Sequence, residues 1–309
     1  NVIITGGTNG QVLSTNGSGA LSWTTPAAGS STSITVDTFT GDGITTSFTL
    51  SITPVSIYNM IVNVDGLVQT AYTNYTISNY CILFNIGKYK VVKDEYTTIN
   101  GNRVPIEFYV LEVDTPQAAK VIATRKRDCA LLEKYFGEYP WAKEKMGIAE
   151  VPNSGMEHQT MITFDNKFIY KTIAGQDYSA NLFHEFAHEW WANKVTNRDW
   201  AHMWIQEGIG TYAEALTFYE LGGQEAYDKI ISGHRRGVRN RKPMVMEEGH
   251  SEDETYSGGD IYGKGSFFMH SLRRLIGDEA FFKGLMRLAT DSAYTYDHFV
   301  GSDDVEKLF

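Results

Sequence analysis

The sequence predicts an α+β protein in which a β-rich N-terminal module precedes a mainly helical domain. Three observations support this prediction. Charged residues become dense only from residue 88, hydrophobic residues alternate at period two up to about residue 114, and helical spacing begins near Pro116. The 309 residues are enough for two domains or three with a sizeable core.

The N-terminal part reads as strands and turns. Residues 1–87 contain no Lys, Arg, Glu or His, and their only charged residues are Asp37, Asp42 and Asp65. Gly-Gly, Asn-Gly and Ser-Gly pairs mark turns in the first thirty residues, and "PAAGSSTS" is typical of a linker. "SFTLSI" and "NMIVNVDGLVQ" alternate at period two, and Asp-Gly at 65–66 suits a tight hairpin turn. We therefore expect a module and linker over 1–80, with its β part at about 31–80.

Strand patterns continue over 81–114, through "CILFNIGKYKVV" and "IEFYVLEV". A helix follows, with a hydrophobic stripe formed by Val121, Ala130, Leu131, Leu132 and Tyr135. Two short strands are expected around "MGIAEVP" and "HQTMITFD", and helices dominate from there to residue 309.

Composition excludes some classes of protein. The net charge of −10 argues against a nucleic-acid partner, since phosphate binding needs a basic face. No apolar run approaches the roughly 18 residues that span a bilayer. Cys81 and Cys129 allow one disulfide, which leaves the redox compartment open. Because the chain starts without Met or a signal sequence, we expect a fragment or a processed product. Its location stays open, and an extracellular or periplasmic one is slightly favoured.

"NLFHEFAHEWW" at 181–191 places two histidines four residues apart. On a helix, His184 and His188 share a face and could direct imidazole nitrogens at one metal ion. Glu185 flanks that ion without binding it, where a general base for an activated water should lie. Asp177 and Ser179 are candidate N-caps. Taken alone, the pattern also fits the solvated face of an ordinary helix.

The segment "HMWIQEGIGTYAEAL" at 202–216 favours the metal site. It has helical periodicity and contains Glu207, which eighteen residues separate from His188, so an antiparallel helix can return a carboxylate to the two histidines. Two His and one Glu form a catalytic zinc set with an open fourth position. Glu214 and Asp199 are candidate acceptors for the second imidazole nitrogens, or else surface charges.

Four segments together resemble the aminopeptidase N family of zinc metallopeptidases, the gluzincin aminopeptidases. "HEFAHEWWANKVTNRDWAHMWIQEGIGTYAE" is similar to the family's zinc signature and "NSGMEHQTM" at 153–161 to its exopeptidase motif. "DIYGKGSFFMHSLR" at 260–273 resembles its Tyr-x-Lys-Gly segment, and "GEYPWAKEK" the stretch before the exopeptidase strand. The resemblance implies a thermolysin-like, mainly helical catalytic domain at 115–309. It also implies that 81–114 are remnant strands of the family's β-saddle domain.

The resemblance also implies the site. His184, His188 and Glu207 would bind one Zn2+ per chain, and Glu185 would be the general base. The remaining roles concern the substrate, a peptide with a free N-terminus: Glu157 would pair with its α-ammonium group, Gly155 and Met156 would line its strand, and Tyr262 would donate to the oxyanion. His158 replaces the motif's usual Asn. Set against the family, we expect this sequence to lack most of the saddle domain and the C-terminal helical domain.

Residues 1–80 resemble segments of bacteriophage tail-fibre proteins, through "GGTNGQVLSTNGSGALSW" and "FTGDGITTSFTL". This part could also be a Thr- and Gly-rich spacer. Trp23 and the Tyr-rich 58–80 region could contact glycans or a surface, although aromatic residues on strands are more often core. The leading function is removal of N-terminal residues from peptides. The alternative is a virion or surface attachment protein with a truncated, weakly active or inactive peptidase region.

Overall fold

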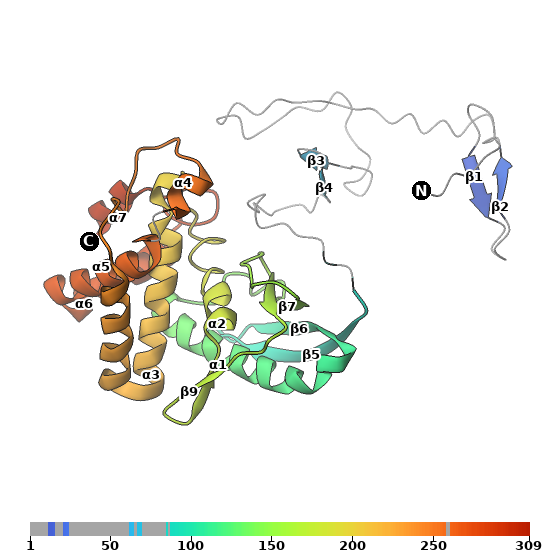
Figure 1. The fold of residues 1–309 in the computed structure, drawn as a ribbon, viewed down its shortest axis with the longest axis horizontal. Coiled ribbons are helices and arrows are strands. Elements are labelled where there is room, and N and C mark those ends of the chain that lie inside the picture. The colour runs from blue at the N-terminus through green and yellow to red at the C-terminus, as the bar shows by residue number, and fades with distance from the viewer. Residues whose placement is uncertain are drawn as a thin grey trace. The chain divides into compact units, whose positions relative to one another are not determined.

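The computed structural model describes residues 12–15, 21–24, 62–64, 67–69, 85, 87–257 and 260–309 (Figure 1). The chain divides into two units, Asn1–Tyr75 and Thr76–Phe309. Each unit is described by itself.

Two short antiparallel pairs are described in the first unit. β1 (Val12–Thr15) pairs with β2 (Leu21–Thr24), and β3 (Val62–Val64) pairs with β4 (Leu67–Gln69). Val64 lies opposite Leu67, while residues 65 and 66, where the Asp-Gly pair predicted a tight turn, lie outside the described residues. The rest of the predicted 31–80 module and Cys81 lie outside the described residues, and the β-rich module as a whole is not confirmed.

The second unit is built on a mixed sheet with the order β5-β6-β7-β8. Its strands are β5 (Tyr89–Thr97), β6 (Arg103–Leu111), β7 (Met146–Val151) and β8 (Met161–Asp165). β5 and β6 are antiparallel, whereas β6-β7 and β7-β8 are parallel. Every residue of β7 is buried, as expected for a strand inside a parallel sheet. The strands expected to be saddle remnants therefore join the sheet that also contains β7 and β8.

The crossover from β6 to β7 runs through the 3-10 helix η3 (Glu112–Gln117) and α1 (Ala118–Phe136). The expected stripe on α1 is partly wrong, because Ala130 is exposed while Val121 and Leu132 are buried. The buried face also contains the charged side chains of Arg125 and Asp128 and the free thiol of Cys129. Hydrophobic residues alone did not reveal this face because polar residues occupy part of it.

The prediction of a mainly helical C-terminal region is confirmed. A small hairpin, β9 (Lys171–Ile173) and β10 (Gln176–Tyr178), precedes the first of these helices. The elements that follow are α2 (Ala180–Ala187), the 3-10 helix η4 (Trp200–His202), α3 (Trp204–Gly237), α4 (Glu252–Tyr256), α5 (Asp260–Ile276), α6 (Asp278–Thr290) and α7 (Ser302–Leu308). Among the helices of the described residues, none combines the length and hydrophobicity needed to cross a bilayer.

The long helices α3 and α5 run side by side, as the yellow and brown-orange ribbons of Figure 1 show. The two backbones come into close contact at two glycines. A Cβ atom on Gly265 would lie 2.6 Å from Gly208 Cα, and one on Gly208 would lie 2.8 Å from Gly265 Cα. Larger residues would force the backbones apart. This contact lies one residue from Glu207 and three from Tyr262, so it sets the separation of two predicted site residues.

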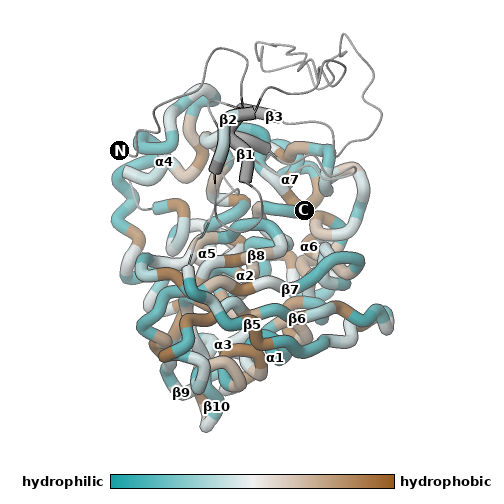
Figure 2. The backbone as a smooth tube through the Cα atoms, turned by 90° about the vertical axis from the view of Figure 1, so that its right-hand side faces the viewer, coloured by the Kyte–Doolittle hydropathy of each residue, from teal (hydrophilic) through white to brown (hydrophobic). Residues whose placement is uncertain are grey.

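Large aromatic side chains fill the core between the sheet and the helices. Trp190 and Trp191 are fully buried, and the Trp191 ring packs edge-on against Phe136 at 5.0 Å between centroids. Figure 2 shows hydrophobic and hydrophilic stretches alternating along the helices, as expected for helices that bury one face. The contact between Trp191 and Phe136 packs the segment after α2 against the end of α1.

Candidate active site

Helix α2 places the two signature histidines on one face. Ser179 caps the helix, because its hydroxyl accepts a hydrogen bond from Leu182 N at 3.5 Å. Asp177, the other candidate cap, lies in β10 instead. The rings of His184 and His188 lie 4.6 Å apart between centroids and are nearly perpendicular, so both Nε2 atoms approach a common point.

Glu207, in the first turn of α3, completes a triangle with these histidines. Nε2 of His184 lies 3.1 Å from Nε2 of His188 and 3.2 Å from Glu207 Oε2. The third side, from His188 Nε2 to Glu207 Oε2, is 3.3 Å. Metal bonds of 2.0–2.1 Å in a tetrahedral zinc site imply ligand separations of about 3.3 Å. The donor types and their spacing therefore fit a zinc ion.

The second nitrogen of each imidazole also has a partner. His184 Nδ1 lies 3.2 Å from Glu214 Oε1, and His188 Nδ1 lies 2.9 Å from the backbone carbonyl of Trp191. Such partners orient metal-binding imidazoles. Asp199 does not take this place, because its carboxylate caps η4 by accepting from Ala201 N at 2.9 Å.

The electrostatics of the cluster favour a cation. Burial lowers the pKa of His188, but the neighbouring carboxylates of Glu157 and Glu207 outweigh burial and raise that pKa to about 9. The pKa of His184 is raised as well. Burial lowers this pKa, but the contacts with the Glu207 and Glu214 carboxylates outweigh burial. A site that binds protons strongly at two imidazoles provides the negative potential that also attracts a metal cation, which would replace those protons.

The segment before β8 lies against α2. Met156 and Thr163 form an antiparallel bridge, with Thr163 N donating to Met156 O at 3.0 Å. Gly155 comes so close to α2 that a Cβ atom there would lie 2.7 Å from both Glu185 Cγ and Asn181 Nδ2. Glycine at this position thus permits the segment to approach Glu185.

Two tyrosines point at the same oxygen of Glu207. The hydroxyl of Tyr262, on α5, donates to Glu207 Oε1 at 2.9 Å, and that of Tyr256, at the end of α4, donates at 3.0 Å. Burial and the adjacent Glu207 both raise the pKa of each tyrosine, so both stay neutral hydrogen-bond donors at physiological pH.

All eight residues predicted for the site line one cavity of about 460 Å³, namely Gly155, Met156, Glu157, His184, Glu185, His188, Glu207 and Tyr262. Trp200, Glu252 and Tyr256 also line it, and sequence reasoning missed all three. Trp200 lies between the ligands His188 and Glu207 in the predicted signature segment. An aromatic residue at that place could have been predicted to line the cavity. Glu252 and Tyr256 follow a loop and carry no spacing signal.

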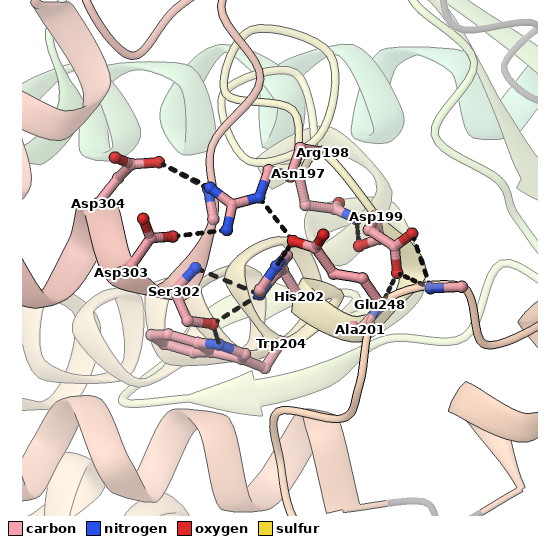
Figure 3. Close-up of polar contacts among 12 residues, drawn as sticks. Asn197, Arg198, Asp199, Ala201, His202, Trp204, Glu248, Ser302, Asp303 and Asp304 are labelled. Atoms are coloured by element: carbon pink, nitrogen blue, oxygen red, sulfur yellow. Dashed lines mark hydrogen bonds and ion pairs between the residues drawn. The ribbon is translucent and has the colours of Figure 1, made fainter. Parts of the chain in front are cut away.

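The loop between His188 and Glu207 is tied to two later segments (Figure 3). Arg198 forms ion pairs with Glu248 at 2.8 Å and with Asp303 at 2.8 Å. The His202 ring lies between Glu248 Oε1 and Ser302 Oγ, 3.0 Å from each. These contacts hold the start of α3, and hence Glu207, against α7 and the segment before α4.

Comparison with known proteins agrees with this geometry. The model of the peptidase family M1 domain matches residues 123–303, more than half of the chain. This chain belongs to peptidase family M1. The matched range includes every residue of the ligand triangle and the cavity.

The known proteins that this chain matches are distant from it in sequence. The chain is 27% identical to aminopeptidase N of Escherichia coli over 71% of its own length, and 24% identical to Tricorn protease-interacting factor F2 of Thermoplasma acidophilum over 74%. It spans only 28% and 30% of the lengths of these two relatives. An M1 zinc metallopeptidase from Deinococcus radiodurans has the same fold, with a TM-score of 0.59, 20% identity, and coverage of 81% of this chain and 55% of that one.

Proposed function

We propose that this M1 protein is a zinc-dependent aminopeptidase that hydrolyses the N-terminal residue from peptides. The observation that carries the proposal is the placement of Glu157. Carboxylate oxygens of Glu157 and Glu185 and a nitrogen of His188 lie within 4.8 Å of one another. An anchor for a positive group therefore lies directly beside the ligand triangle, where it can hold a free N-terminus one residue from the reacting bond.

We assign the zinc ligands to His184, His188 and Glu207. When bound there, zinc lowers the pKa of a coordinated water and polarises the substrate carbonyl. Glu185 follows the first ligand and is buried beside the second, and we assign it the removal of a proton from the attacking water. The hydroxyl of Tyr262, on α5, lies beside the ligand Glu207, and we assign it the donation of a hydrogen bond to the developing oxyanion.

Gly155, Met156 and Glu157 form the substrate side of the cavity in this proposal. The described residues that line the cavity include four glutamates and no Lys or Arg. Glu157 and Met156 belong to the segment that bridges to β8, so an extended peptide can lie along it. The resulting substrate class is peptides with a free α-ammonium group.

Replacing Glu157 by Ala tests this proposal. We expect wild-type protein to cleave free aminoacyl chromogens much faster than their N-acetylated counterparts. Glu157→Ala should reduce kcat/KM for the free substrates by about 10- to 150-fold, the loss of one charged hydrogen bond of about 1.5–3 kcal/mol. Zinc content, measured by atomic absorption, should not change.

Glu252→Ala is the matched control, because Glu252 lines the same cavity but is exposed on α4. This variant should keep the preference for free substrates. If wild-type protein cleaves acetylated and free substrates at equal rates, the aminopeptidase proposal is wrong and a zinc endopeptidase replaces it.

We further propose that residues 1–80 fold apart from residues 81–309. The change in charge near residue 88 and the division of the chain at residue 75 support this boundary. Limited proteolysis should cut between about residues 75 and 88 and release a C-terminal piece that keeps its zinc. A chain that resists cleavage there and melts in one transition would contradict the boundary. The matches above do not support an attachment function, tail-fibre ancestry or glycan contact for 1–80, and an extracellular or periplasmic location stays a prediction.

A further inference from the structure

Two buried side chains behind the ligand triangle hold the segment that carries Glu157. Glu189 directly follows His188, and Asn193 lies one turn further along. Asn193 Nδ2 donates to the backbone carbonyl of Glu157 at 2.9 Å and to Glu189 Oε2 at 3.1 Å. Glu189 Oε1 in turn accepts from Thr160 N at 3.0 Å. The pair therefore contacts the segment of Glu157 at both of its ends.

The turn at Thr160 needs such support. Thr160 has a φ of 58°, in the left-handed region that a β-branched residue rarely adopts. Its carbonyl accepts from Gly147 N at 2.8 Å, and a Cβ atom on residue 147 would lie 2.4 Å from that carbonyl oxygen. Glu189 binds the amide of the same residue. The conformation of the turn is thus imposed by its neighbours rather than by its own sequence.

Three nitrogen donors satisfy the Glu189 carboxylate, namely Trp141 Nε1 at 2.7 Å, Thr160 N and Asn193 Nδ2. The Tyr139 hydroxyl lies 3.3 Å from Glu189 Oε1 and 3.0 Å from the Lys145 carbonyl oxygen, to which it can donate instead. Glu189 is 1% exposed and does not line the cavity. Burying a carboxylate is costly unless its oxygens are satisfied, and here the partners that satisfy them include the amide of Thr160 and the side chain of Asn193, which an apolar residue could not bind.

The geometry assigns Glu189 and Asn193 as positioning residues that fix Glu157 relative to the zinc ligands and so set the selectivity for a free N-terminus. His188 is the C-cap residue of α2, and Glu189 and Asn193 follow in the turns directly after the helix. One short stretch of chain thus supplies a metal ligand, His188, and two side chains that hold the segment of the amine anchor, Glu189 and Asn193. This inference rests on the proposed aminopeptidase function.

A binding experiment separates positioning from general stability. The probes are an α-amino hydroxamate, which binds zinc and offers a free ammonium group, and its N-acetyl counterpart, which binds zinc alone. Calorimetry on the full zinc-loaded chain gives the ratio of the two affinities without any turnover. For Asn193→Ala we expect this ratio to fall by about tenfold, the scale of one lost hydrogen bond. Affinity for the acetylated probe and zinc content should stay at the wild-type level.

Two variants make the test specific. Glu189→Gln keeps one acceptor oxygen, and its amide can turn the Asn193 side chain away from Glu157, so the ratio should fall between wild type and Asn193→Ala. Tyr212→Phe removes a buried hydrogen bond to Tyr227, 3.1 Å long and outside the cavity, and should leave the ratio unchanged.

The outcomes distinguish this inference from the function on which it rests. If wild-type protein binds both probes equally, the proposed amine anchor fails and the inference fails with it. If wild-type protein prefers the free amine but Asn193→Ala keeps the full ratio, only the positioning role is wrong. A fall in both affinities together with zinc content would also overturn it, because that is the result of a purely structural defect.

Discussion

Glu185→Gln is expected to abolish most turnover while leaving zinc in place. Glu185 is not part of the triangle formed by His184, His188 and Glu207, so its loss spares the ligands. Burial raises the pKa of Glu185 to about 7, near the operating range of a general base at neutral pH. A glutamine of the same shape cannot accept the proton. We expect kcat to fall by about 10²- to 10⁴-fold.

The measurement pairs kinetics on a free aminoacyl chromogen with metal analysis of the same sample. Glu252→Gln makes the same chemical change at another glutamate of the cavity and should keep kcat close to wild type. Turnover by Glu185→Gln at the wild-type rate would remove Glu185 from the role of base. Loss of zinc from this variant would show instead that Glu185 supports the metal.

His184→Ala is expected to reduce zinc content to near background and activity with it. Its Nε2 is one corner of the ligand triangle and lies 3.1 Å from His188 Nε2 and 3.2 Å from Glu207 Oε2. The remaining two ligands cannot hold a tetrahedral zinc ion with comparable affinity. The zinc-loaded wild type should also melt at a higher temperature than chelated protein, whereas the variant should show no such difference, since a ligand that binds only the folded state stabilises it.

His234→Ala is the matched control for this variant. His234 lies on α3 outside the cavity, where its ring contacts Ser266 Oγ at 2.9 Å. It should keep one zinc per chain. Full zinc content in His184→Ala would contradict the assignment of the metal site.

The candidate site could be predicted from sequence because its main spacing is local. Two residues four apart on a helix share a face whatever surrounds the helix, so His184 and His188 were recognisable from the chain alone. Glu207 was recognisable because eighteen residues allow an antiparallel return. Asp199 shows where this reasoning stops, because a carboxylate at a plausible distance in sequence caps η4 instead of contacting an imidazole.

The fold was predictable to a similar depth. The spacing of hydrophobic residues and the positions of turn-forming residues separated strands from helices in the second unit. The C-terminal region is mainly helical, as predicted. The stripe on α1 was partly wrong because Arg125 and Asp128 are buried there, which a rule based on hydrophobic residues cannot detect. The joining of β5 and β6 to the sheet of β7 and β8 depends on strand pairing between distant segments.

The sequence by itself indicated two imidazoles, a carboxylate ligand and a flanking glutamate, because residue type and backbone geometry over a few turns relate them. Glu157 was predicted only through the resemblance to the aminopeptidase N family. Only the tertiary structure decided how far Glu157 lies from the triangle and what holds it there. That distance depends on Asn193, on Glu189 and on the left-handed turn at Thr160, which are brought together by packing across the core. Packing of this kind is set by many non-local contacts at once, and no local spacing in the chain encodes it.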